Sequence, residues 1–215
     1  MTSRTRTTLA ALGGIVLALA GAQGCSSPVA TPTGTTDTIY ATATLDGWVT
    51  KGGQAVTAGQ GPYAGQLSPA NADTSISSRQ FYSFDISIPV TAHLLGARLD
   101  LYQANVVGDP YAALGNLMLD HVAYGAALTA SAYTLSALNP SITFSTDSNL
   151  AVKSAIVTSW VQNDIDNGRT RTQVRLRFVS EFGPIPINET TQFSDAELSC
   201  CGGAGVPPRL IVSWQ

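Results

Sequence analysis

Two short segments place arginine and tyrosine side chains where they could bind an acidic sugar. In "ARLDLYQ", Arg98 and Tyr102 project from one face of a predicted strand, and in "TQVRLRFVS", Arg175 and Arg177 share one face of another. Planar guanidinium groups bind carboxylates bidentately, and aromatic rings can stack on sugar rings. If the two strands are neighbours, these four residues line one surface. The alternative is a solvated outer face with cross-strand ion pairs, such as Asp100 with Arg98 or Arg177.

The cysteines offer a second kind of chemistry. The chain has three, and two of them, Cys200 and Cys201, are adjacent. Their Cα atoms are about 3.8 Å apart across a trans peptide, whereas a relaxed disulfide needs about 4.4–6.8 Å. We expect a strained Cys200–Cys201 disulfide, with free thiols, a bridge to another molecule or a metal pair as alternatives. A metal pair has little support, because His93 and His121 are the only histidines and neither has ligand spacing.

The third cysteine, Cys25, follows an export signal. Arg4 and Arg6 precede an apolar run of about 14 residues, which is typical of a secretory signal and too short for a stable membrane anchor. Cys25 comes directly after "AGAQG", which resembles the lipobox of bacterial lipoproteins. We therefore predict a lipoprotein signal peptide over residues 1–24 and a lipid on Cys25. The protein would then be exported and membrane-anchored, at the cell surface or in the periplasm. The alternative is ordinary secretion with Cys25 as a free thiol.

Composition and motifs argue against two classes of function. The formal net charge is −3 and only 12% of residues are charged, so no basic footprint for nucleic acid is present. There is no G-x-S-x-G phrase, and nothing singles out a glycosidase pair among the 14 acidic residues. We therefore predict that the protein is not an enzyme. No cofactor is expected, with a structural calcium ion near Asp46 or Asp195 as the alternative.

The elements that must position these side chains are mainly strands. Residues 25–37 are rich in Ser, Thr and Pro and predict a flexible tether before a domain over residues 38–215. Residues 57–75 form the longest segment without a pattern. Four segments alternate apolar and polar residues, as strands covering one side of a core do. Their predicted inward residues are Tyr82, Phe84, Ile86, Ala97, Leu99, Leu101, Val174, Leu176, Phe178, Leu210, Val212 and Trp214.

One segment departs from this alternation. Val152, Ile156 and Trp160 recur every four residues, which predicts an amphipathic helix over about 150–166. Asn167–Gly168 can end the helix in the left-handed conformation. We expect this helix to close one end of the β-structure, with Trp160 in the core.

The order of the segments resembles the DNRLRE-type domain family. The resemblance depends on "SSRQFYSFDISIPVTAHLLGARLDLYQ", then "VKSAIVTSWVQNDIDNG" before "VRLRFV", then "FSDAELSCCGGAGVPPRLIVSW". The eponymous string is absent. The resemblance implies an all-β jelly-roll β-sandwich and a non-catalytic module that binds carbohydrate, in some members acidic polysaccharides. The expected partners are a polysaccharide or cell-surface component, and the membrane through the lipid anchor. The alternative is a structural or adhesion lipoprotein without a sugar ligand.

Overall fold

The computed structural model describes residues 34–53, 55–57, 63–68, 75–89, 91–184, 187–196 and 206–215. The chain divides into two units, Met1–Thr31 and Pro32–Gln215, and the described residues all belong to the second. The predicted signal peptide, the predicted lipidation site Cys25 and the predicted Cys200–Cys201 disulfide all lie outside the described residues.

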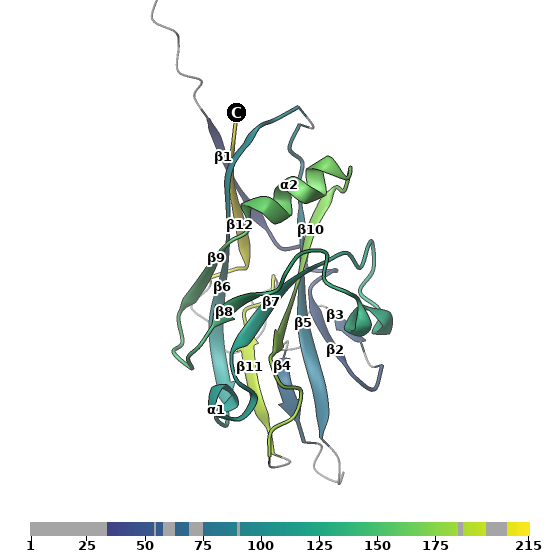
Figure 1. Cartoon of the computed structure of the whole chain (residues 1–215), viewed down its shortest axis with the longest axis vertical. Coiled ribbons are helices and arrows are strands. Elements are labelled where there is room, and N and C mark those ends of the chain that lie inside the picture. The colour runs from purple at the N-terminus through teal and green to yellow at the C-terminus, as the bar shows by residue number, and fades with distance from the viewer. Residues whose placement is uncertain are drawn as a thin grey trace, which may run out of the picture. The chain divides into compact units, whose positions relative to one another are not determined.

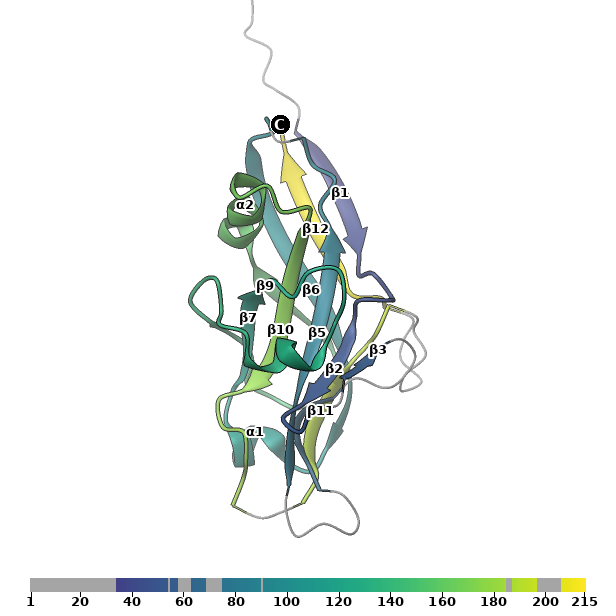
Figure 2. The same ribbon diagram turned by 90° about the vertical axis from the view of Figure 1, so that its right-hand side faces the viewer.

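The protein is mostly antiparallel β-structure with a few short helices, as the alternation predicts (Figures 1 and 2). Strand pairings run in the order β1-β12-β6-β11-β4-β5-β10-β7-β8, with β2 on β5, β3 on β2 and β9 on β6. The elements are β1 (Thr35–Tyr40), β2 (Gly47–Thr50), β3 (Ala55–Thr57), β4 (Tyr63–Leu67), β5 (Ile76–Asp85), β6 (Leu94–Val107), α1 (Pro110–Leu114), β7 (Leu117–Val122), the 3-10 helix η1 (Ala130–Thr134), β8 (Ile142–Ser145), β9 (Val152–Ile156), α2 (Thr158–Asp166), β10 (Arg171–Phe178), β11 (Glu189–Phe193) and β12 (Arg209–Trp214).

The long strand β6 connects the strand group β1, β12 and β9 with the strand group that begins at β11. Its first half pairs with β12 and β9, and its second half pairs with β11. The pairings therefore join all the described strands into one antiparallel sheet.

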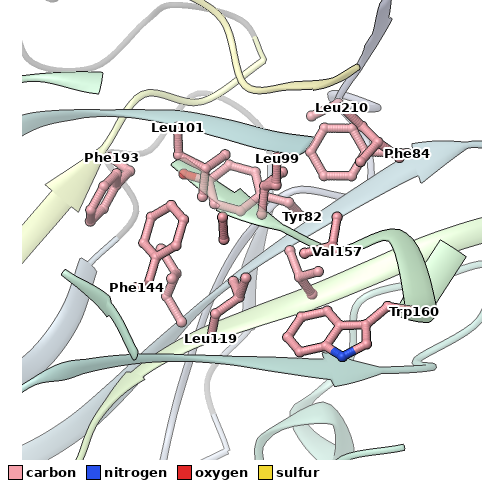
Figure 3. Packing of buried hydrophobic residues seen from close by; sticks show 14 of the residues in the cluster. Tyr82, Phe84, Leu99, Leu101, Leu119, Phe144, Val157, Trp160, Phe193 and Leu210 are labelled. Atoms are coloured by element: carbon pink, nitrogen blue, oxygen red, sulfur yellow. The ribbon is translucent and has the colours of Figure 1, made fainter. Parts of the chain in front are cut away.

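The main hydrophobic core contains the inward residues predicted from the alternation. Leu99 and Leu101 on β6 face Leu119 on β7, with Tyr82 from β5 between them (Figure 3). Eleven of the twelve predicted inward residues are buried in this core, and the twelfth, Trp214, is partly buried against it. A fully buried side chain of this size contributes about 1.5–3 kcal/mol, so this core is the main source of stability.

A second, smaller core covers the opposite face of β5 and β7. Phe81 and Val122 project away from the main core and pack against Leu128, Ala132 and Tyr133. Those three residues belong to the segment after β7, which includes η1. The alternation in the β5 segment predicts that this outer face is mainly polar. It is instead buried, because the segment between β7 and β8 folds over it.

The predicted helix over 150–166 is wrong in its first half. Val152–Ile156 is strand β9, paired with β6, and the helix α2 begins only at Thr158. A spacing of four residues fits a helix turn, but it also returns to the same face of a strand, so Val152 and Ile156 were ambiguous. The second half is confirmed, since Trp160 is buried and the helix ends at Asn167–Gly168, where Gly168 has φ +66°.

Two boundaries also differ from the expectation. Strand β1 begins at Thr35, three residues before the predicted start of the domain. Strand β4 lies inside the 57–75 segment that was predicted to have no regular structure. Gly65 explains why β4 gives no clear pattern: its φ is +130°, and a Cβ there would lie 2.2 Å from the backbone oxygen of Glu189. Close strand pairing thus requires a glycine where a strand pattern would show a side chain.

In the described part of the chain, no helix has the length and apolar character needed to cross a bilayer.

Candidate functional site

Arg175, a predicted ligand-binding residue, is buried and makes its hydrogen bonds within the protein. Its side chain donates from Nε and Nη2 to Asp120 Oδ2 at 2.9 and 2.6 Å. Its Nη1 donates to the backbone oxygens of Tyr133 and Leu135 at 3.1 and 2.8 Å. Only 4% of Arg175 is exposed, because the segment containing η1 covers it. The prediction that Arg175 lies on an open binding surface is therefore wrong.

Arg177 belongs to the same cluster. Its Nε donates to Asp120 Oδ2 at 2.8 Å, and its Nη2 donates to Ser141 Oγ at 3.3 Å. The expected ion pair is therefore real, but its acid is Asp120 rather than Asp100. Burial acts to raise the pKa of Asp120, but hydrogen bonds from Ser141, Arg177 and Arg175 outweigh it, so the pKa lies below its ordinary value.

The two predicted pairs of binding residues do not share a surface. Arg98 and Tyr102 lie on β6, whereas Arg175 and Arg177 lie on β10, and β11, β4 and β5 come between these strands in the sheet order. The predicted surface of three arginines and a tyrosine does not form.

A different arginine, Arg209, lies beside Arg98, and the alternation of residues does not indicate this. Asp100 is 2% exposed and accepts hydrogen bonds from Arg98 Nε and Nη2 at 2.9 and 3.0 Å and from Arg209 Nε at 3.1 Å. Ser154 Oγ donates to the same carboxylate at 2.7 Å. Burial acts to raise the pKa of Asp100, but these hydrogen bonds from Arg98, Ser154 and Arg209 hold it below its ordinary value.

The strand register places two tyrosines on the same face as these arginines. Tyr40 on β1 is opposite Arg209 on β12, and Arg209 is in turn opposite Asp100 on β6. Directly opposite residues on neighbouring strands project to the same side of a sheet. Tyr102 lies two positions beyond Asp100 and therefore shares that side. We call the surface formed by Tyr40, Arg98, Tyr102 and Arg209 around Asp100 the arginine–tyrosine face.

This face presents polar and aromatic groups to solvent. The side chains of Arg98 and Arg209 are 49% and 37% exposed, and Tyr40 is 56% exposed. Each guanidinium has a fixed position because Asp100 holds it, yet keeps N–H donors that Asp100 does not use. Such an arrangement can donate hydrogen bonds to hydroxyl or carboxylate groups while the tyrosine rings contact a sugar ring. Arg209 was visible in the sequence as an outward residue, but only the register places it beside Arg98.

His121 belongs to a buried structural network. Its side chain is fully buried, and Nε2 lies 3.0 Å from both carboxylate oxygens of Asp164. The ring stacks on Trp160, with the centroids 5.4 Å apart. Asp164 also accepts hydrogen bonds from Arg169 and Thr172. These contacts tie α2 to β7 and β10 and leave the imidazole inaccessible to a substrate.

The acids suggested for a calcium ion are both buried. Asp46 Oδ2 accepts a hydrogen bond from the Ala196 amide at 2.6 Å, next to Asp195. Across the described ranges, no group of three or more His, Cys, Asp or Glu side chains is placed to hold a metal ion.

The sequence was also compared with protein-family models and with curated proteins, and none matches this chain.

Proposed function

We propose that this chain is an exported, lipid-anchored, non-catalytic surface module that binds carbohydrate. In this proposal the strands form a jelly-roll β-sandwich of the DNRLRE type. The packing of β6 and β12 side chains against those of β5 and β7 across the main core supports a layered arrangement (Figure 3). The arginine–tyrosine face is then the outer surface of one layer.

The observation that carries the proposal is the pair of arginines held by one buried carboxylate on an exposed sheet face. Asp100 fixes Arg98 and Arg209 before any ligand arrives, so less side-chain entropy is lost on binding. Tyr40, beside Arg209 in the register, supplies an exposed ring for contact with a sugar. A sugar-binding surface needs these two kinds of group in one place.

Charge favours an acidic polysaccharide over a neutral one. Two arginines surround one carboxylate, so Asp100, Arg98 and Arg209 together carry a net positive charge. A carboxylate on the ligand can accept hydrogen bonds from the free edge of a guanidinium group, and such charge-assisted bonds are the strong ones. Because the face is open, this attraction should weaken as salt is added.

Affinity gel electrophoresis tests the proposal directly. The processed protein should be retarded by a gel that contains a polyuronate, and less by a gel that contains dextran. Arg98→Gln and Arg209→Gln should each remove most of this retardation, and Tyr40→Ala should reduce it. Lys51→Gln is the control, because Lys51 is an exposed cation directly after β2 that pairs with Glu181 and belongs neither to this face nor to β6, β12 or β1. Retardation that is unchanged in Arg98→Gln and Arg209→Gln, or absent from every gel, would exclude carbohydrate binding by this face.

A structural or adhesion role without sugar is the second candidate, and one observation favours it. Ile156 is 73% exposed and Val152 is 40% exposed on β9, next to the arginine–tyrosine face. Exposed apolar side chains on an outer strand suit contact with another protein. In that case Ile156→Lys should abolish association in sedimentation experiments, and no polysaccharide gel should retard the protein.

The anchor can be tested separately from the ligand. Strand β1 begins ten residues after Cys25, so the intervening chain can span at most about 35 Å. A lipid on Cys25 would therefore hold the domain close to the membrane surface. Cys25→Ala should move the protein from the membrane fraction to the soluble fraction, and the mass of the processed wild-type protein should include the lipid. An unmodified Cys25 in the mature protein would rule out the anchor.

A further inference from the structure

A pocket between the start of β10 and the turn after β7 belongs to neither core nor to the arginine–tyrosine face. Its volume is about 400 Å³, and its walls include Ala123, Ala126, Arg169, Arg171 and Gln173. This size falls in the range of small-molecule sites. We infer that this pocket binds a small organic carboxylate with a compact apolar body.

Arg171 is the guanidinium group that can accept such a ligand. Its Nη1 donates to Thr42 Oγ1 at 3.0 Å and Ser83 Oγ at 3.3 Å, which fixes its direction. Its Nη2 lies 3.4 Å from Asp85, whose side chain is 55% exposed. That contact is long and solvated, so it is weak. A ligand carboxylate can replace Asp85 at Nη2 without uncovering a buried charge.

Arg169, unlike Arg171, is paired with a buried carboxylate, and it forms part of the pocket wall. Its Nε donates to Asp164, which is 1% exposed, at 2.6 Å, and its Nη2 donates to the Asn163 backbone oxygen at 3.1 Å. It therefore satisfies a carbonyl in the last turn of α2, where the helix dipole places partial negative charge. The positive charge of Arg169 offsets that partial negative charge beside the pocket. Arg169 thus makes the site compatible with a carboxylate.

The opposite wall is rigid before any ligand binds. Gln173 Oε1 accepts hydrogen bonds from the Tyr124 and Gly125 amides at 2.8 and 2.9 Å, and its Nε2 donates to the Gly125 backbone oxygen at 2.8 Å. Gly125 has φ +80°, so it tolerates the tight turn that these bonds require. A preformed pocket loses less entropy on binding.

The apolar body of the ligand can contact Ala123 and Ala126, which line the pocket beside the arginines. The combination of one exchangeable guanidinium with apolar walls selects an organic carboxylate over an inorganic anion.

Titration of the ¹⁵N-labelled protein with benzoate, benzamide and inorganic phosphate tests this inference. Benzoate should bind saturably, and its amide shifts should be confined to 123–126 and 168–173. Benzamide has the same body without the charge and should bind at least tenfold more weakly. Phosphate should not compete with benzoate. Binding of phosphate and benzoate with equal affinity would overturn the carboxylate assignment, and so would the absence of saturable benzoate binding.

Variants at Arg171 and at Asp85, whose carboxylate competes with the ligand for Arg171, should change benzoate affinity in opposite directions. Arg171→Gln should weaken binding at least tenfold, whereas Asp85→Asn should tighten it by about two- to fivefold, because it removes a weak ion pair. Ala126→Phe should block the pocket while leaving the exposed surface around it folded. Arg98→Gln should leave benzoate binding unchanged. Absence of benzoate binding by this pocket can therefore be distinguished from absence of polysaccharide binding by the arginine–tyrosine face. Unchanged benzoate affinity in Arg171→Gln would overturn the inference.

Discussion

Asp120→Asn is expected to destabilise the protein strongly, because it removes the only carboxylate bound to Arg175 in the described part of the chain. Asp120 is fully buried and Arg175 is 4% exposed. Breaking a buried pair by removing one partner costs about 3–5 kcal/mol. Arg175 keeps two backbone acceptors, Tyr133 and Leu135, so we expect the lower end, about 3 kcal/mol. For a domain of this size that loss lowers Tm by about 6–12 °C.

Urea denaturation and thermal scans of the protein measure this loss in the free energy of unfolding. Asp85→Asn is the matched control, because Asp85 pairs with Arg171 at 3.4 Å on the surface and should cost less than about 1 kcal/mol. The double variant Asp120→Asn with Arg175→Gln should recover part of the loss, since it leaves no buried unpaired charge. A loss below 1 kcal/mol in Asp120→Asn would show that Arg175 is not buried against this carboxylate.

Two further predictions concern the core and acid stability. Trp160→Ala should cost about 3–5 kcal/mol because the indole is buried between α2 and the main core, whereas Ile156→Ala should change the free energy of unfolding by less than about 0.5 kcal/mol. Equal losses in urea denaturation would contradict this placement of the two residues. The pKa values of Asp100 and Asp120 lie below the ordinary value of about 3.9, so their contribution is complete above that pH and is lost as pH falls through the lowered pKa values. Stability measured from pH 6 to pH 2 should therefore fall below pH 4, and the fall should be smaller in Asp120→Asn.

The alternation of apolar residues was enough to predict the main core. In β6, for example, Ala97, Leu99 and Leu101 are buried against the core while Arg98 and Tyr102 point outward. This pattern is local, because each strand must place one face against apolar neighbours wherever it lies in the sheet. The predominance of β-structure followed from it for the same reason.

Pairing partners and covering segments could not be predicted in this way. Nothing in "ARLDLYQ" or "TQVRLRFVS" indicates that β6 pairs with β12 while β10 pairs with β5 and β7. Arg209 therefore remained one outward residue among several, although the register places it beside Arg98. Gly65 is a second example. A glycine is required there because the Glu189 backbone lies too close for a Cβ, and Glu189 is more than a hundred residues away in the sequence.

The chain uses one arrangement, a buried carboxylate that holds two arginines, in two different environments. Asp120 holds Arg175 and Arg177 beneath the segment that contains η1, so most of their donors are used within the protein. Asp100 holds Arg98 and Arg209 on a face where both side chains remain more than a third exposed. The arrangement itself does not distinguish the two roles, because each strand shows the same outward polar pattern. The difference comes from a distant segment that covers one pair and leaves the other open to solvent. We therefore expect Asp120 to matter mainly for stability and Asp100 mainly for binding.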